Sequence, residues 1–422
     1  MHVAMVSQHA SPLAAPGDPG AGGQNVHVRG LAVGLAAAGH RVTVLTRRDS
    51  PDLPDVVELA ADPSGGSAHV HHVTAGPATH LPADRLVAHV PKLADELVRL
   101  WRADRPDVVH AHHWMSGLAA TAAVRDLDVP LVQTFHGLGH VERRYHGEHR
   151  TGPAGRPSAE QVISRRADRV VATCEDELFE LVRMAAPRKR ISIVPSGVDV
   201  EAFRPDGTTL VRGERPRLVV LGRLAPRGGV DDVITALARV PDAELLVGGG
   251  SAAGEGPGAD PDLRRLFGVA AAVGAADRVR FLGPVARDTV PALLRSADAV
   301  VCAPRDQPFG MVALEAMACG RAVVATAVGG MKDTVVDRVT GLLVAPRRPD
   351  KLADVLRGLL ADRAMPVAYG IAGRDRVLSR YTWSRIAAAT AAVYAEVLGR
   401  RVVERPEEET GTTEAAGGSD PG

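Results

Sequence analysis

The sequence is poor in lysine, aromatic residues and cysteine, and each shortage excludes a class of protein. Four lysines leave arginine to supply 46 of the 50 basic residues, an imbalance typical of coding bias rather than of function. The acidic residues also number 50, so the formal net charge is zero and we predict no nucleic-acid partner. Three widely spaced cysteines cannot form a disulfide framework, which indicates a reducing, cytoplasmic environment.

Long hydrophobic runs are missing as well. No stretch approaches the roughly 18 consecutive apolar residues of a membrane-spanning helix, so we expect no transmembrane segment. Residues 1–7 are too short and too uncharged for a signal peptide. Because aromatic residues make up 3% of the chain, the core must be built from valine, leucine and alanine.

Short apolar runs alternate with amphipathic stretches along all 422 residues, the pattern of repeated β/α units. The first unit joins a strand at 1–7 to a helix with Val28, Leu31 and Leu35 at helical spacing, followed by a strand at 41–46. The other predicted strands are 108–111, 131–134, 170–173, 218–221, 244–247, 279–282, 299–302, 322–325 and 342–344.

This pattern predicts an α/β fold with two doubly wound, Rossmann-like domains that face each other across a cleft. We assign residues 1–200 to the N-terminal domain, 201–380 to the C-terminal domain, 381–400 to a terminal helix and 401–422 to a disordered tail. Ligands bind such sheets outside the carboxyl ends of the strands, so the cleft is the expected site.

The segment 304–320 carries the strongest local signal for chemistry. A predicted strand ends before it, and a helix begins near Gly310. Because a helix N-terminus presents free N–H groups and partial positive charge, the amides of Gly310, Met311 and Val312 are placed to hold a diphosphate. Glu315, one turn into the helix, is placed to accept hydrogen bonds from ribose hydroxyls. The alternative is a plain loop with a solvated glutamate.

Other candidates stand at the ends of predicted strands. Arg223 follows the strand 218–221 and is placed to chelate phosphate oxygens, although a surface arginine is the commoner case. His136 follows the strand 131–134, at the cleft edge, where it would hydrogen-bond a sugar hydroxyl. Histidines also gather at 69–72 and 110–113, but no spacing of ligands completes a zinc site, so we expect no metal.

Taken together, these residues resemble glycosyltransferase family 4, retaining enzymes of GT-B architecture, over about residues 1–400. The opening Gly-Gly-Gln-Asn is most similar to the branch with the mycothiol-pathway inositol-phosphate N-acetylglucosaminyltransferase and sucrose-phosphate synthase. The matching motifs, in order, are Gly-Gly-Gln-Asn-Val-His-Val (22–28), Gly-His-Arg-Val-Thr-Val (39–44), His-His-Trp-Met-Ser-Gly (112–117), Thr-Phe-His-Gly-Leu-Gly (134–139), Pro-Ser-Gly-Val-Asp (195–199), Gly-Arg-Leu (222–224), Pro-Phe-Gly (308–310), Glu-Ala-Met-Ala-Cys-Gly (315–320) and Val-Gly-Gly (328–330).

The resemblance implies an NDP-sugar donor bound mainly by the C-terminal domain, a small hydroxyl acceptor bound by the N-terminal domain, and retaining transfer without a metal or other cofactor. Arg223 would neutralise the diphosphate, Glu315 would bind the ribose and His136 would contact the donor sugar. The further donor contacts that it implies are Gly23, Gln307, Phe309, Gly310, Met311 and Val312. The acceptor contacts that it implies are Asn25, His113, Arg143 and Arg144.

Two positions depart from the family pattern. The phosphate-binding lysine of Gly-Arg-Leu-x-x-x-Lys-Gly is replaced by Gly228, and the first of two paired glutamates by Gln307. A lost charge-assisted hydrogen bond costs about 1.5–3 kcal/mol, and a missing oxyanion-type donor costs about 10²–10³ in rate. Arg227 would partly replace the lysine charge, and Gln307 keeps an amide for the sugar.

Three functions therefore stay open. The first is an active retaining hexosyltransferase, whose acceptor is a phosphorylated sugar or polyol or a secondary metabolite. The second is a catalytically weakened homologue that binds a sugar nucleotide or a partner protein. The third is a sugar-nucleotide 2-epimerase of the same architecture, which needs acid/base carboxylates in the cleft and is disfavoured by Gln307.

Overall fold

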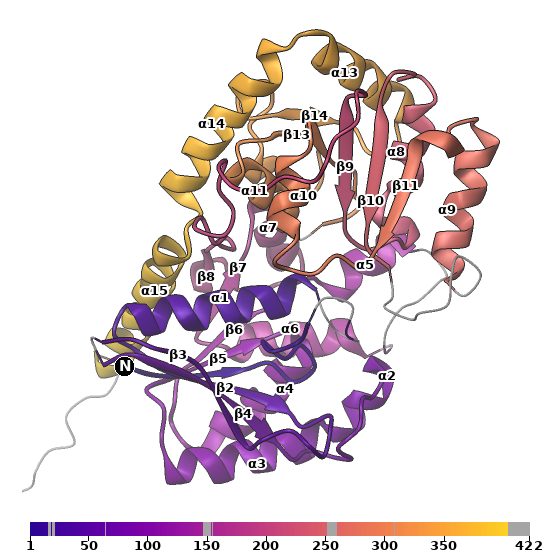
Figure 1. Cartoon of the computed structure of the whole chain (residues 1–422). Coiled ribbons are helices and arrows are strands. Elements are labelled where there is room, and N and C mark those ends of the chain that lie inside the picture. The colour runs from indigo at the N-terminus through magenta and orange to yellow at the C-terminus, as the bar shows by residue number, and fades with distance from the viewer. Residues whose placement is uncertain are drawn as a thin grey trace, which may run out of the picture.

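Two parallel-sheet α/β domains make up the part of the chain that the computed structural model describes, residues 1–15, 18, 22–63, 65–146, 153, 155–250, 260–307 and 309–403. The N-terminal domain lies below the C-terminal domain in Figure 1. No helix among these residues is long and apolar enough to cross a membrane.

The N-terminal sheet has the strand order β3-β4-β2-β1-β5-β6-β7-β8. Its strands are β1 (His2–Val6), β2 (Arg41–Arg47), β3 (Val56–Ala61), β4 (Ser67–Val73), β5 (Val108–His112), β6 (Leu131–Thr134), β7 (Arg169–Ala172) and β8 (Ile191–Ile193). All neighbours are parallel except the edge strand β3, which runs antiparallel to β4. The sequence predicted five of these strands and missed β3, β4 and β8. The missed strands are less apolar because they lie at or near the two edges of the sheet.

The C-terminal sheet is wholly parallel, in the order β11-β10-β9-β12-β13-β14. Its strands are β9 (Arg217–Leu221), β10 (Glu244–Gly248), β11 (Val279–Gly283), β12 (Ala299–Cys302), β13 (Ala322–Thr326) and β14 (Leu342–Val344). All six were predicted, because the central strands are covered on both faces and appear as continuous apolar runs, and the edge strands β11 and β14 are still mostly apolar. The winding reverses between β1 and β5 in one sheet and between β9 and β12 in the other, where such folds bind ligands.

The predicted helices at the cleft are present with nearly the expected bounds. The apolar face of α1 packs into the core of the domain through Val28, Leu31 and Leu35, which are at most 1% exposed. The helices of the N-terminal domain are α1 (Gly23–Ala37), α2 (Ala83–Leu86), α3 (Val90–Ala103), α4 (Trp114–Ala123), α5 (Gly139–His146), α6 (Arg156–Arg166) and α7 (Glu175–Arg183). The helices that follow are α8 (Val230–Leu237), α9 (Pro261–Ala272), α10 (Val290–Arg295), α11 (Met311–Ala318), α12 (Met331–Thr334), α13 (Pro349–Ala361) and α14 (Ala364–Arg380).

The last helix, α15 (Trp383–Val403), crosses back to the N-terminal domain and lies beside α1 (Figure 1). Its Trp383 indole is held between two glycines, since a Cβ at Gly30 or at Gly197 would lie 2.1 or 2.6 Å from the ring. The helix extends to Val403, beyond the predicted end at residue 400, so the first residues assigned to the tail are helical. The rest of the predicted disordered tail lies outside the described residues.

A methyl group at position 30 tests this packing. We expect Gly30→Ala to lower the free energy of unfolding by about 1–3 kcal/mol, because Trp383 is held on its other side by Gly197 and cannot move away. Gly358→Ala in α13 is the control, since a Cβ there meets nothing within 4 Å and should stabilise the helix by about 0.5–1 kcal/mol. Equal effects in urea unfolding would contradict the packing argument.

Candidate functional site

The N-termini of two helices converge between the domains. α1 begins directly after Gly22 and α11 directly after Gly310. A Cβ at Gly23 would lie 3.8 Å from Met311 Sδ, so the first residues of the two helices are in van der Waals reach. Each helix N-terminus carries roughly half a positive charge and unpaired N–H groups. Their convergence makes a site for an anion.

Arg223 adds a full positive charge at the same place. It follows β9, and its Nη2 lies 3.1 Å from the position of a Cβ on Gly22, so its guanidinium reaches the start of α1. The side chain remains open to solvent, yet the surrounding protein lowers the pKa of Arg223, and the nearby charge of Arg227 lowers it further. Within the described residues Arg223 forms no salt bridge. Its charge therefore remains available to a ligand.

A cavity of about 370 Å³ opens beside Arg223 at the carboxyl ends of β9, β10 and β11. Glu315 lines its inner wall, is 3% exposed, and pairs with Arg287 Nη2 at 2.6 Å. Burial raises the pKa of the Glu315 carboxyl, and Arg287 opposes the rise. The alternative of a solvated glutamate is therefore wrong. The cavity is lined by residues 221–225, 248–250, Asp260, Asp262, Pro284, Val285, Arg287, Val290, Val312 and Glu315.

The loop before α11 presents backbone rather than side chains. Gln307 Nε2 donates a 2.6 Å hydrogen bond to the Phe309 carbonyl. The Phe309 ring packs into the apolar core and is 9% exposed. At Gly310 a Cβ would lie 2.5 Å from Met331 Sδ, so the loop fits closely against α12. Pro308 lies outside the described residues.

The turn after Arg223 has room only for a glycine at position 228. Gly228 ends a 3₁₀ turn (Pro226–Gly228), and a Cβ there would lie 2.3 Å from the Arg223 carbonyl oxygen. Real Cβ atoms do not come so close to backbone. A lysine at 228 is therefore incompatible with this path of the chain, and any side chain there would displace Arg223.

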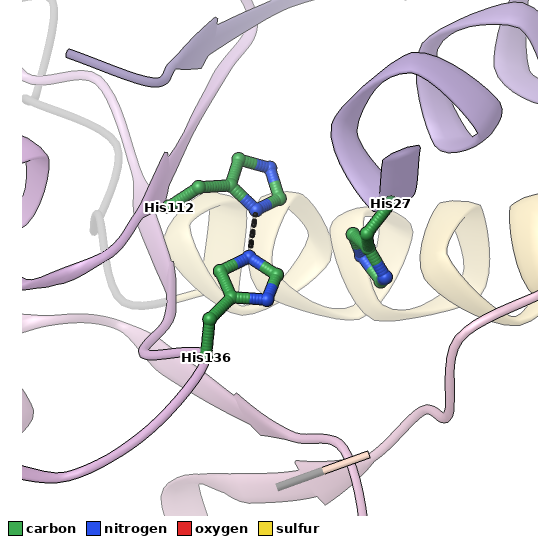
Figure 2. A group of neighbouring side chains, drawn as sticks. All are labelled: His27, His112 and His136. Carbon is green, nitrogen blue, oxygen red and sulfur yellow. Dashed lines mark hydrogen bonds between the residues drawn. The ribbon is translucent and has the colours of Figure 1, made fainter. Parts of the chain in front are cut away.

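Three histidines of the N-terminal domain lie close together (Figure 2). His112 at the end of β5, His136 after β6 and His27 on α1 each bring one ring nitrogen within 4.8 Å of the others. His112 Nδ1 lies 2.9 Å from His136 Nε2, and His27 Nδ1 lies 2.9 Å from Ser196 Oγ. Burial lowers the pKa of His27 to about 4 and those of His112 and His136 well below their ordinary value, so the rings are neutral.

Three neutral imidazoles are also a donor set that a zinc ion accepts. The sequence pattern did not predict this cluster, because its members come from α1, the end of β5 and the loop after β6, and the nearest pair in sequence is 24 residues apart. The sequence signals that could have indicated this cluster are the place of His27 on the predicted helix and the places of His112 and His136 at or just after the ends of predicted strands. Our expectation of no metal stays a prediction.

The acceptor candidates have different surroundings. His113 is partly buried on backbone with a positive φ (74°), and its ring centre lies 4.3 Å from that of His9. Asn25 Oδ1 accepts a 2.6 Å hydrogen bond from the Gly22 N–H, so it caps α1 and shapes the loop. Arg144 makes two hydrogen bonds to Glu180, at 2.8 and 3.1 Å, whereas Arg143 is exposed. His113 thus lies beside His9, and Asn25 and Arg144 are already partnered.

Comparison with known proteins identifies the family. The model for Glycosyltransferase Family 4 matches residues 21–202, and the model for Glycosyl transferases group 1 matches residues 207–376. The D-inositol 3-phosphate glycosyltransferase of Streptomyces bingchenggensis is 36% identical over 94% of this chain and 89% of its own length. The chain belongs to glycosyltransferase family 4. The protein of the same name from Xylanimonas cellulosilytica is 37% identical, over 94% of this chain and 97% of its own.

Solved structures agree on the architecture. Sucrose-phosphate synthase from Thermosynechococcus elongatus superposes with a TM-score of 0.86 at 30% identity, covering 94% of this chain and 99% of that one. Anabaena HepE in complex with UDP-glucose has a TM-score of 0.69 at 19% identity, covers 94% and 100%, and supports the fold alone. The fold of this glycosyltransferase is therefore GT-B, as the resemblance implied.

The buried histidines predict acid sensitivity. The unfolded chain binds a proton at His27 below pH about 6.5, whereas the folded protein binds it near pH 4. The unfolded state therefore binds more protons between these values, and stability falls as the pH is lowered. We expect His27→Asn to reduce the slope of the unfolding free energy against pH, near pH 5, by about 1.4 kcal/mol per unit. Urea unfolding series at several pH values measure it, and an unchanged slope would contradict the neutral assignment.

Proposed function

We propose that this glycosyltransferase moves a hexose from an NDP-sugar to a small hydroxyl acceptor, with retention of anomeric configuration. The observation that carries the proposal is the meeting of two helix N-termini at Arg223, whose charge has no salt-bridge partner in the described structure. The relatives' printed names, D-inositol 3-phosphate glycosyltransferase and sucrose-phosphate synthase, support a phosphorylated polyol or sugar as the acceptor.

Each part of the donor would bind at a different place in the site. The diphosphate would lie at the starts of α1 and α11, with Arg223 and Arg227 supplying positive charge. The ribose would reach Glu315, displacing part of its pairing with Arg287, while the base would occupy the cavity beyond. Cleavage of the anomeric bond develops negative charge on the departing diphosphate, and donors fixed in advance stabilise that charge best.

In the proposed transfer the attacking hydroxyl loses its proton to the leaving diphosphate, and departure and attack occur on the same face of the sugar. Same-face transfer gives retention. NMR of the product's anomeric proton would test this step directly.

A second candidate is a weakened homologue that binds a sugar nucleotide without efficient transfer. Two observations favour it. The turn at Gly228 leaves no room for the family's lysine, and the Gln307 amide is already used by the Phe309 carbonyl. Such a protein would bind NDP-sugars but turn them over slowly.

Charge removal tests the diphosphate site. We expect Arg223→Leu to lower kcat/KM for the donor about 100-fold, because it removes a charge-assisted contact worth roughly 1.5–3 kcal/mol. We expect Arg227→Leu to lower it about tenfold, because Arg227 shares the same diphosphate with Arg223 and contributes less. Arg102→Leu, on the exposed face of α3, should leave the rate unchanged. The donor is first chosen from UDP-, GDP-, ADP- and dTDP-sugars as the one that raises the melting temperature most. Full activity of Arg223→Leu would exclude the proposed site.

Restoring the family residues separates the two candidates. If the native turn is catalytically competent, Gly228→Lys should reduce turnover at least tenfold by displacing Arg223, and Gly228→Ala should do the same through its Cβ alone. Gln307→Glu should also reduce turnover, because its carboxylate would face the Phe309 carbonyl. A wild-type protein that binds donor without turnover, together with gain of activity in Gly228→Lys/Gln307→Glu, would establish the second candidate instead.

A further inference from the structure

His136 stands on strained backbone at the edge of the cleft. Its φ of 59° lies in the left-handed region that non-glycine residues rarely adopt, and such strain concentrates at functional sites. Its Nε2 lies 2.9 Å from His112 Nδ1, and its ring makes no other hydrogen bond to the described residues. Because both rings are neutral, a single proton lies between these two nitrogens.

The surroundings of His112 decide which ring donates that proton. The residue is fully buried, and its Nε2 has no hydrogen-bond partner in the described part of the chain. A proton on Nε2 would leave a buried N–H without an acceptor, which is costly and rare. A proton on Nδ1 leaves a lone pair unpaired and donates the N–H to His136. The second arrangement is therefore favoured.

The His112 ring also packs against the ring of His110. His110 lies on the same face of β5, and the centres of the two rings are 4.2 Å apart. Both nitrogens of His110 have partners, Tyr394 Oη of α15 at 2.7 Å and Thr134 Oγ1 at 2.8 Å. With its neighbour locked in this way, the His112 ring keeps its orientation toward His136.

We propose that His112 is a positioning residue that fixes His136 in its Nδ1–H tautomer. A neutral His136 whose Nε2 accepts a hydrogen bond must carry its proton on Nδ1, the nitrogen that points away from His112 (Figure 2). The part-exposed ring then offers a donor, which matches a hydroxyl or phosphate oxygen of the ligand, and it cannot serve as a base there. The identity of that ligand rests on the proposed function; the tautomer does not.

A shared metal ion is the competing account of the same three rings. Zinc–nitrogen bonds of about 2.0–2.1 Å at tetrahedral angles hold two ligand nitrogens about 3.3 Å apart. The 2.9 Å separation of His112 and His136 is shorter and matches a hydrogen bond. The hydrogen-bonded pair is therefore the arrangement that the structure supports.

Long-range ¹H–¹⁵N NMR of the full chain, labelled at histidine, tests the tautomer without any need for turnover. The His136 signals are assigned by their loss in His136→Asn. We expect a protonated Nδ1 and an unprotonated Nε2. An Nε2–H tautomer would overturn the proposal, as would a joint shift of the His27, His112 and His136 signals on adding Zn²⁺. His69→Asn, on β4, is the control and should leave the His136 signals unchanged.

Two substitutions of His112 separate positioning from a general structural role. Asn places an amide N–H near the position of Nδ1, whereas Leu offers no donor. We expect His112→Asn to keep the His136 tautomer and most of kcat, and His112→Leu to mix the tautomers and lower kcat about tenfold with a smaller change in KM. Equal losses in both variants, with an unchanged tautomer, would overturn the positioning role. If the proposed function fails and no turnover is found, the NMR result still decides the tautomer.

Discussion

The position of the terminal helix is the constraint on which the arrangement of the cleft depends. Trp383 fits between Gly30 of α1 and Gly197 in the segment that joins the two sheets, so it fixes α1 relative to the chain that leads into the C-terminal domain. Two contacts between α12 and α7 support the same arrangement, Lys332 with Asp176 at 2.6 Å and Asp333 with the Glu175 N–H at 2.8 Å. The meeting of the α1 and α11 N-termini follows from these contacts.

The charges of the cleft are divided in a way that suits an anionic donor. Glu315 is neutralised by Arg287, and the clustered histidines His27, His112 and His136 are uncharged, but Arg223 keeps its charge for a ligand. Two helix N-termini add roughly half a charge each. An arginine so placed stays protonated in spite of its lowered pKa, because its ordinary value lies far above neutral pH. The folded protein therefore holds positive charge that a diphosphate would neutralise.

The fold was largely predictable from the sequence, and the site in part. Parallel strands covered on both faces are mostly apolar, so all six strands of the C-terminal sheet were predicted, whereas the half-exposed β3 and the histidine-rich β4 were missed. The positions of Arg223 beside α1 and of Glu315 on the cavity wall could be predicted, because strand ends and helix starts are local features of the sequence. Arg287 and the contact of His112 with His136 were not, because they depend on which distant elements become neighbours.

The replacement of the family's lysine by Gly228 could mean either a lost phosphate contact or a turn that requires glycine, and the backbone geometry favours the second interpretation. Coding bias alone would have replaced a lysine with arginine, so composition does not explain a glycine there. The structure gives a physical reason for its retention: the turn brings the Arg223 carbonyl to 2.3 Å from where a Cβ would stand, and this tight turn holds Arg223 where it meets α1. Arg227, one residue earlier, carries a positive charge close enough to lower the pKa of Arg223. The turn therefore excludes a side chain at position 228 and still brings a second cation near Arg223.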